Sequence, residues 1–310
     1  GPYTFTYALN GVPQAPVATA SDPYTLNVTL AGTYTIVNVT DANCTNNGTG
    51  TTTVSYFPKP TGTISGTTEL CRGSSATLTM TFTGTAPFTF TYTDGTTPVT
   101  VVAHPTNVYT VSVSPLVNTT YTLTSLTDGN VCTGVVSGSA VITINLPPVL
   151  TLTGTNLICY NVHTGAVNMV ITNGTAPFGF SWTGPNGFNA NTQNISALEA
   201  GYYSVVVNDT KGCTGTANIT LTQPPVLTGS ADGTNITCFG PNDGTITISG
   251  AAGGAGTHEF TINGGIGWQA SPVFSSLIPG SYNVQMRDAV NPTCMLTLNG
   301  ALLLTQPAVL

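Results

Sequence analysis

Apolar and polar residues alternate with a period of two in short runs along the whole chain. Such runs include TLTMTFTG at 77–84, FTFTY at 88–92, YTVSV at 109–113, YSVVV at 203–207 and TITIS at 245–249. Successive side chains of a β-strand point to opposite faces, so this pattern predicts strands that bury one face. Turn pairs such as Asp94-Gly95 and Asp128-Gly129 separate the runs, and no segment shows a helical period with caps. The chain is therefore predicted to be all-β.

Two phrases recur along the chain. The first reads TAPFTFTYTD at 85–94 and TAPFGFSWTG at 175–184, and the opening GPYTFTYALNG resembles it without its start. The second consists of a Tyr, an alternating strand, an Asp and a Cys, and it occurs at 32–44, 119–132, 201–213 and 280–294. Recurrence at a fixed period indicates tandem repeats. We divide the chain into a partial repeat 1 (1–57) and full repeats 2 (58–146), 3 (147–223) and 4 (224–310). Because the chain begins in mid-phrase, we expect it to be cut from a longer array.

Each full repeat holds roughly seven short strands in about 80 residues, which favours an immunoglobulin-like sandwich of two antiparallel sheets. The junctions are short and rich in proline, as in PPVL at 147–150 and QPPVL at 223–227. Such linkers favour extended, semi-rigid geometry. The predicted fold is thus a tandem series of immunoglobulin-like β-sandwich repeats that forms an elongated rod.

The aromatic residues of the two phrases are candidates for the core. Proline cannot donate to a β-ladder, so Pro87 and Pro177 are expected where strands begin. The alternating aromatic residues that follow are expected to face the space between the sheets, although Trp182 could instead be an exposed binding platform. The Tyr that opens the second phrase is either a tyrosine corner or an ordinary core aromatic; these residues are Tyr34, Tyr121, Tyr203 and Tyr282.

Charge is scarce and mostly acidic. Only 5% of the 310 residues are charged, and the formal net charge is −7 with four Lys and Arg residues. This composition excludes nucleic acid as a partner, because nothing neutralises a row of phosphates, and it disfavours an anionic membrane surface. The apolar run Ala301–Leu304 is far shorter than a membrane span. We therefore expect no membrane insertion in this segment.

Cysteines occur once early and once late in each full repeat. The early and late residues are Cys71 and Cys132, Cys159 and Cys213, and Cys238 and Cys294. This regular placement predicts one disulfide within each full repeat, formed in an oxidising, extracellular setting. The alternative is that these cysteines are reduced and buried as small hydrophobic residues. Cys44, the seventh, is expected to be unpaired because its partner would precede residue 1. There is no CxxC motif and no histidine cluster, so a zinc site is not expected.

No residue pattern indicates catalysis. His104, His163 and His258 occupy non-equivalent positions in three repeats, and neither GxSxG nor HExxH occurs. The glycine-rich stretch 250–256 lacks the GK[ST] of a phosphate-binding loop. We therefore expect no enzyme activity, no cofactor and no catalytic or metal-binding residue. The Asp that precedes each late Cys is the best calcium candidate, but single carboxylates favour a turn role. These residues are Asp41, Asp128, Asp209 and Asp288.

Repeats 3 and 4 resemble the SprB-type repeat of Bacteroidota surface adhesins. The pattern runs from an early Cys through an aromatic strand, a Leu-x-x-Gly-x-Tyr step, an Asp and a late Cys to a closing Gln-Pro. Repeat 4 carries it as Cys238, Asn242-Asp243-Gly244, Phe260, Leu277, Gly280, Tyr282, Asp288, Cys294 and Gln306-Pro307. Repeat 3 carries it as Cys159, Ala176-Pro177-Phe178, Trp182, Leu198, Gly201, Tyr203, Asp209, Gly212-Cys213 and Gln223. Repeat 2 departs from it, since it lacks the Gly before Tyr121 and the Gln-Pro ending.

The resemblance implies a segment of a long, filamentous adhesin on the cell surface, exported by type IX secretion. Its repeats would support attachment and gliding motility. The implied partners are an external surface or its glycans, and other copies of the chain or the surface motility machinery are further candidates. The alternative function is a spacer or carbohydrate-binding module array of a secreted hydrolase, which would require exposed, coplanar aromatic side chains.

Overall fold

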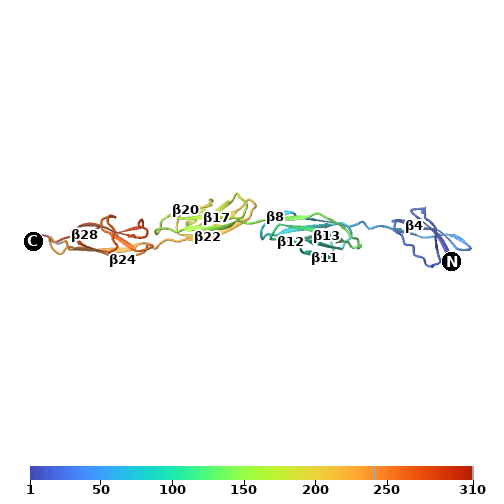
Figure 1. The fold of residues 1–310 in the computed structure, drawn as a ribbon, viewed down its shortest axis with the longest axis horizontal. Coiled ribbons are helices and arrows are strands. Elements are labelled where there is room, and N and C mark those ends of the chain that lie inside the picture. Colours follow the sequence, from blue (N-terminus) through green and yellow to red (C-terminus); the bar gives the residue numbers. More distant parts are fainter. Residues whose placement is uncertain (241, 309–310) are drawn as a thin grey trace. The chain divides into compact units, whose positions relative to one another are not determined.

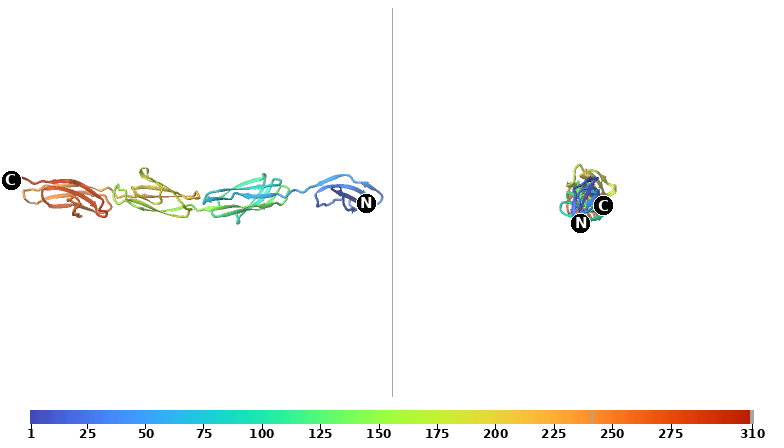
Figure 2. Two further views of the ribbon diagram at one scale, coloured as in Figure 1. Left: turned by 90° about the horizontal axis from the view of Figure 1, so that it is seen from above. Right: turned by 90° about the vertical axis from the view of Figure 1, so that its right-hand side faces the viewer.

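The computed structural model describes residues 1–240 and 242–308. The chain divides into two compact parts, Gly1–Thr143 and Ile144–Leu310, and we describe each by itself. Every sheet lies inside one of the four repeats, and all regular structure in the described residues is strand apart from a short 3₁₀ turn at Pro185–Gly187 (Figures 1 and 2). The predicted all-β class is confirmed.

Repeat 1 forms a single six-stranded sheet. The strand order is β2-β1-β4-β5, with β3 also paired to β1 and β6 to β4. Phe5 and Tyr34 are buried on this sheet. Its strands are β1 (Tyr3–Leu9), β2 (Val12–Pro13), β3 (Val17–Thr19), β4 (Gly32–Thr40), β5 (Thr45–Asn47) and β6 (Thr51–Val54).

Repeat 2 is a sandwich of two sheets, with strand orders β11-β10-β13-β15-β8 and β12-β9-β7-β14. Phe82, on one sheet, packs 4.5 Å from Phe90 on the other, measured between ring centroids. β10 begins directly after Pro87, as predicted. The strands are β7 (Thr61–Ser65), β8 (Thr68–Cys71), β9 (Ala76–Phe82), β10 (Phe88–Thr93), β11 (Pro98–His104), β12 (Val108–Val113), β13 (Thr119–Thr127), β14 (Val135–Ser137) and β15 (Ala140–Asn145).

Repeat 3 has the sheets β16-β17-β20 and β19-β18-β21-β22. Trp182 lies between them with 1% of its surface exposed, and its indole N–H donates to the carbonyl of Thr192 at 2.9 Å. Trp182 is therefore a core residue and not an exposed platform. The strands are β16 (Val149–Thr155), β17 (Gly165–Thr172), β18 (Gly179–Thr183), β19 (Asn189–Ala190), β20 (Ile195–Leu198), β21 (Gly201–Asn208) and β22 (Thr214–Leu221).

Repeat 4 has the sheets β23-β24-β26 and β25-β27-β28, and Figure 1 labels one strand of each, β24 and β28. Ile246 and Met286, from opposite sheets, are fully buried in its core. The strands are β23 (Thr228–Thr234), β24 (Gly244–Ala252), β25 (His258–Thr261), β26 (Val273–Leu277), β27 (Gly280–Asp288) and β28 (Met295–Leu304). The immunoglobulin-like sandwich prediction is confirmed.

The tyrosines that open the second phrase in repeats 1, 3 and 4 form tyrosine corners. Each hydroxyl donates to the carbonyl four residues earlier. The bonds run from Tyr34 to Leu30 at 2.7 Å, from Tyr203 to Glu199 at 3.0 Å and from Tyr282 to Ile278 at 2.7 Å. The corner hypothesis is thus the correct one for these three residues, and the bond fixes the start of β4, β21 and β27.

Candidate functional site: the disulfide junction between repeats 3 and 4

The Asp before each late Cys shapes the turn that presents the cysteine. In repeat 3, the Asp209 N–H donates to the Cys213 carbonyl at 3.0 Å, and Oδ1 of Asp209 accepts the Cys213 N–H at 2.8 Å. Oδ2 accepts the N–H of Thr175, at the start of the first phrase, at 3.0 Å. The carboxylate therefore ties the late-cysteine turn to the neighbouring loop.

The same arrangement recurs in the other repeats. Asp128 bonds Cys132 and Thr85 in repeat 2, and the Asp288 N–H donates to the carbonyl of Cys294 at 3.0 Å in repeat 4. In repeat 1, Oδ1 of Asp41 accepts the Cys44 N–H at 2.8 Å. The four aspartates thus act as turn residues, as the sequence predicts. The described part of the chain brings no group of three His, Cys, Asp or Glu side chains together as a metal site would need.

These hydrogen bonds change the titration of the carboxyl groups. Burial raises the pKa of Asp128, Asp209 and Asp288, but the backbone N–H donors outweigh it and leave each pKa below its ordinary value. A carboxylate that accepts several backbone N–H bonds is stabilised in its charged form. The turns are therefore built for an ionised aspartate.

The early and late cysteines of one repeat lie at opposite ends of its sandwich. The late-cysteine turn of repeat 3 lies at the end where the chain enters, since the Cys213 Sγ is 3.9 Å from the Asn145 carbonyl oxygen. The early-cysteine loop lies where the chain leaves, because the Leu157 N–H donates to Thr222 at 3.0 Å and the Asn161 N–H to Gln223 at 2.7 Å.

This geometry overturns the predicted disulfides. A strand of about seven residues spans about 23 Å, whereas a disulfide needs Cα atoms within about 7 Å. The structure instead joins Cys159 of repeat 3 to Cys294 of repeat 4, with a Cα–Cα distance of 5.4 Å. The predicted pairs Cys159 with Cys213 and Cys238 with Cys294 are therefore wrong. The early cysteine of repeat 3 is bonded to the late cysteine of repeat 4.

Cys132 and Cys238 also depart from the prediction. Cys132 and Cys238 are free thiols, so the pair Cys71 with Cys132 is wrong as well. Cys71 and Cys213 each take part in a disulfide. Cys44 is free and exposed.

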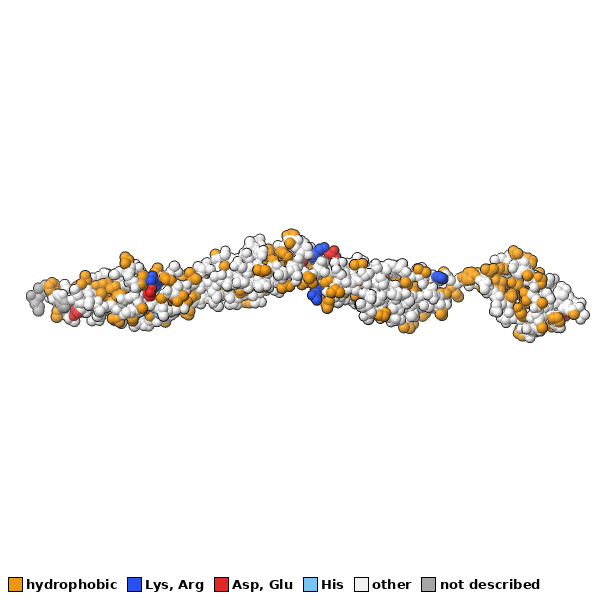
Figure 3. Space-filling model, viewed as in Figure 1, with side chains coloured by type: hydrophobic (Ala, Val, Ile, Leu, Met, Phe, Trp, Pro, Cys, Tyr) orange, Lys and Arg blue, Asp and Glu red, His pale blue; other side chains and the backbone are white. Residues whose placement is uncertain are grey.

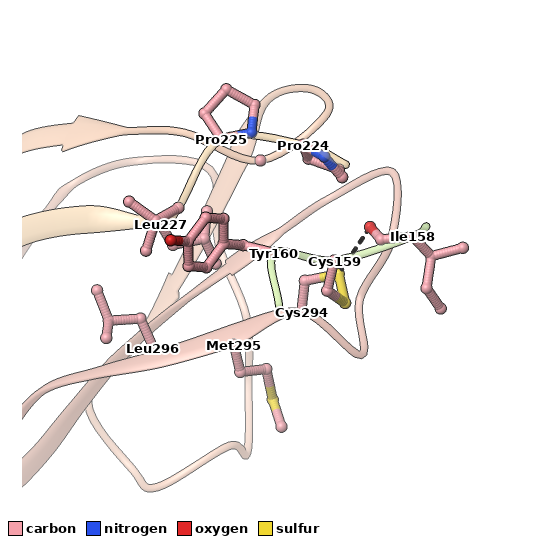
Figure 4. Close-up of a pocket in the computed structure, with 11 residues that line it drawn as sticks. Ile158, Cys159, Tyr160, Pro224, Pro225, Leu227, Cys294, Met295 and Leu296 are labelled. Atoms are coloured by element: carbon pink, nitrogen blue, oxygen red, sulfur yellow. Dashed lines mark hydrogen bonds between the residues drawn. A yellow bond between two sulfur atoms is a disulfide. The ribbon is translucent and has the colours of Figure 1, made fainter. Parts of the chain in front are cut away.

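The disulfide lies at the edge of a small groove of about 130 Å³ between repeats 3 and 4 (Figure 4). Tyr160, next to the early cysteine, extends toward Leu227 of the following linker in that view. The Cys294 Sγ lies 3.1 Å from the Ile158 carbonyl oxygen. Two features therefore line the junction: the aromatic residue next to the early cysteine, and the Pro-Pro-Val-Leu linker.

The role of Tyr160 and of the linker in this junction was not predicted from the sequence. A signal was present: TNLICY at 155–160 recurs as TNITCF at 234–239, with an aromatic residue after Cys159 and after Cys238. The strands alone, without their arrangement in space, did not indicate which end of the sandwich carries the cysteine.

The histidines make separate local contacts. His104 Nε2 lies 2.9 Å from the Val108 carbonyl, and His258 Nε2 lies 2.9 Å from the Gly253 carbonyl. His163 Nε2 is 3.2 Å from a carboxylate oxygen of Glu199 on the surface. The Thr106 hydroxyl also lies 2.9 Å from His104 Nε2 and donates to the Val108 carbonyl at 3.0 Å. The contacts of each histidine stay within its own repeat.

The second tryptophan is half-buried and covered by a cation. The Arg287 guanidinium lies 4.3 Å from the centroid of the Trp268 ring and pairs with Glu259 at 2.6 Å. The face visible in Figure 3 otherwise carries few charged side chains, in keeping with the composition. Among residues 1–240 and 242–308, no helix is long and apolar enough to cross a membrane.

One segment of the chain matches a known protein family. Residues 230–267, from β23 to beyond β25, match the SprB repeat. No curated protein sequence matches the chain.

Several solved structures share its strand-rich character at low similarity. One is a structure related to the host cell surface retention of a 1.5-MDa bacterial ice-binding adhesin. It is 16% identical, with a TM-score of 0.33, and the match covers 81% of this chain and 98% of that one. The N-terminal four Ig domains of Dscam1 isoform 6.44 are 12% identical, with a TM-score of 0.22 and coverage of 98% and 91%. A marsupial T cell receptor is 10% identical, with a TM-score of 0.32 and coverage of 73% and 96%.

Proposed function

We propose that this chain is a segment of a long extracellular adhesin of the cell surface, whose repeats form its stalk and support attachment and gliding. The observation that carries the proposal is the match of residues 230–267 to the SprB repeat within a tandem series of related sandwiches. By resemblance, export is through type IX secretion, and the partners are an external surface or its glycans.

The disulfide junction supports an extracellular location. Disulfides persist in oxidising compartments and are rare in the cytosol. Cys159 and Cys294 form such a bond between two repeats, and a covalent link between neighbouring repeats suits a protein that transmits tension between a cell and a surface.

A non-enzymatic function agrees with the placement of the polar groups. Catalysis requires titratable groups that converge on a reacting atom. Here the histidines are held by separate local contacts in three repeats, and the aspartates are engaged by backbone N–H donors. We therefore favour a structural and adhesive protein over an enzyme.

The two tryptophans do not support the alternative of a carbohydrate-binding module array. Such modules bind sugars on exposed aromatic faces. Trp182 is 1% exposed, and Arg287 covers a face of Trp268. Neither tryptophan offers a free platform.

The test uses live cells of the source organism and beads coated with antibody against this segment. Beads that bind and travel along the cell are expected for a motile surface adhesin. Beads that bind and remain in place would support a role in attachment and contradict a role in gliding. If the beads do not bind to intact, washed cells that contain the protein, the surface location would be contradicted. Beads with antibody against a cytosolic protein are the control.

A further inference from the structure

The loop that carries Cys238 repeats the loop that carries Cys159. The sequences TNLICY and TNITCF align Cys159 with Cys238 and Tyr160 with Phe239. In repeat 3 this cysteine is bonded to the late cysteine of the following repeat. In repeat 4 the equivalent cysteine is a free, exposed thiol.

The two loops are held at the same end of their repeats by the same hydrogen bonds. In repeat 3, the Leu157 N–H donates to the Thr222 carbonyl, and the Thr222 N–H donates to the Asn156 side chain at 2.9 Å. In repeat 4, the Ile236 N–H donates to the Thr305 carbonyl at 3.0 Å, and the Thr305 N–H donates to the Asn235 side chain at 2.9 Å. Cys238 is therefore presented where the chain leaves repeat 4, as Cys159 is in repeat 3.

The aromatic neighbour is also in place. Tyr160 lines the groove against the Pro-Pro-Val-Leu linker of repeat 4. Its counterpart Phe239 is 57% exposed, a large apolar side chain beside a free thiol. Phe239 therefore stands beside the Cys238 thiol at the sequence position that Tyr160 occupies beside Cys159.

We propose that Cys238 is a covalent docking site for the late cysteine Cys44 of a second copy of this chain. Cys44 is a free, exposed late cysteine. Its turn has the hydrogen bond that presents Cys294, because the Asp41 N–H donates to the Cys44 carbonyl at 2.9 Å and the Asp288 N–H to that of Cys294 at 3.0 Å. Cys132 is the weaker candidate, since it is half-buried.

The linkage forms by oxidation of two thiols. The Cys238 and Cys44 thiols lose two protons and two electrons and form one S–S bond. Oxidised glutathione, a disulfide oxidant, accepts the two protons and the two electrons and is released as two molecules of reduced glutathione. The exchange passes through a mixed disulfide, from which the second protein thiolate displaces glutathione.

The experiment mixes two distinguishable forms of the full chain in a glutathione redox buffer. The first keeps Cys238 as its only free thiol, through Cys44→Ser and Cys132→Ser. The second keeps Cys44 through Cys132→Ser and Cys238→Ser, and a matched control keeps Cys132 instead. Covalent dimers are separated on non-reducing gels, and their cross-linked peptides are identified by mass spectrometry.

We expect the Cys238–Cys44 dimer to form at least several-fold faster than the Cys238–Cys238 or Cys238–Cys132 dimers. Phe239→Ala should slow it several-fold while the reaction of Cys238 with a small thiol reagent stays unchanged, which separates docking from simple reactivity. Equal rates for all three dimers, or a Cys238 that stays reduced beside Cys44, would overturn the proposal.

Discussion

Breaking the disulfide between Cys159 and Cys294 should destabilise both repeats that it joins. Cys159→Ser removes the bond from the side of repeat 3, and Cys294→Ser removes it from the side of repeat 4. In tandem proteins each repeat normally responds to its own interactions and to those with its neighbours. Because this bond crosses the junction, either substitution should act on repeats 3 and 4 alike.

The magnitude follows from the loop that the bond closes. When repeat 4 unfolds beside a folded repeat 3, its chain is held at the linker near Pro224 and at Cys294. That loop has roughly 70 residues, and closing it lowers the entropy of the unfolded chain by the equivalent of about 4 kcal/mol. The loop for repeat 3, from Cys159 to the linker, is of similar length and gives about the same value. For a domain of this size, about 4 kcal/mol corresponds to a fall in Tm on the order of 20 °C.

Hydrogen exchange measured by mass spectrometry resolves the two repeats. Peptides from β21 report on repeat 3 and peptides from β27 report on repeat 4. Both sets should lose protection in Cys159→Ser and in Cys294→Ser, and in the natural chain after reduction. Cys238→Ser removes a free, exposed thiol and is the matched control, with no change expected. Loss of protection in one repeat alone would refute the coupling, and loss in Cys238→Ser would refute the assigned pairing.

Three further substitutions test the interior of repeat 3. Trp182→Phe should lower the free energy of unfolding by about 2–4 kcal/mol in urea, because it leaves a cavity and an unpaired Thr192 carbonyl; a change below 0.5 kcal/mol would contradict the buried placement. Tyr203→Phe should cost about 1 kcal/mol through loss of the bond to the Glu199 carbonyl, while a Tm equal to that of the natural chain would argue against the corner. Asp209 has a pKa lowered in the folded state, so its stabilising effect is complete above its ordinary pKa near 4 and disappears as the pH falls through the folded-state value. Tm measured from pH 7 to pH 3 should therefore fall less steeply for Asp209→Asn, and identical slopes would show that this carboxylate does not contribute.

The strands and their buried faces could be predicted from the sequence because alternation is a local property. Phe88, Phe90 and Tyr92 stand at alternate positions of one run, and all three are buried in the structure. The position of Pro87 before β10 follows from its missing N–H. The turn role of the aspartates was also predictable, because one carboxylate supplies too few oxygens for calcium.

The partners of the cysteines could not be predicted in the same way. In a tandem series, pairing an early cysteine with the late cysteine of its own repeat is as regular as pairing it with that of the next. The spacing of Cys159, Cys213 and Cys294 therefore does not discriminate between the two. What decides is the path of the chain, which places the early-cysteine loop by Gln223 and the late-cysteine turn by Asn145. That information is in the order of the strands and not in the intervals between cysteines.

The same path determines what tension can do to the protein. A force applied along the chain from residue 144 to residue 308 has a covalent route through Cys159, the disulfide and Cys294. Residues 160–293 lie outside that route, so most strands of both repeats cannot be extended while the bond is intact. In single-molecule pulling we expect this segment to lengthen by on the order of 450 Å only after reduction, the contour length of the bypassed residues at about 3.4 Å each. An extension of that size under oxidising conditions would show that the bond does not bypass the repeats. If no such extension occurs until the bond is reduced, the disulfide junction sets the mechanical strength of this part of the chain, and the folding of each sandwich does not.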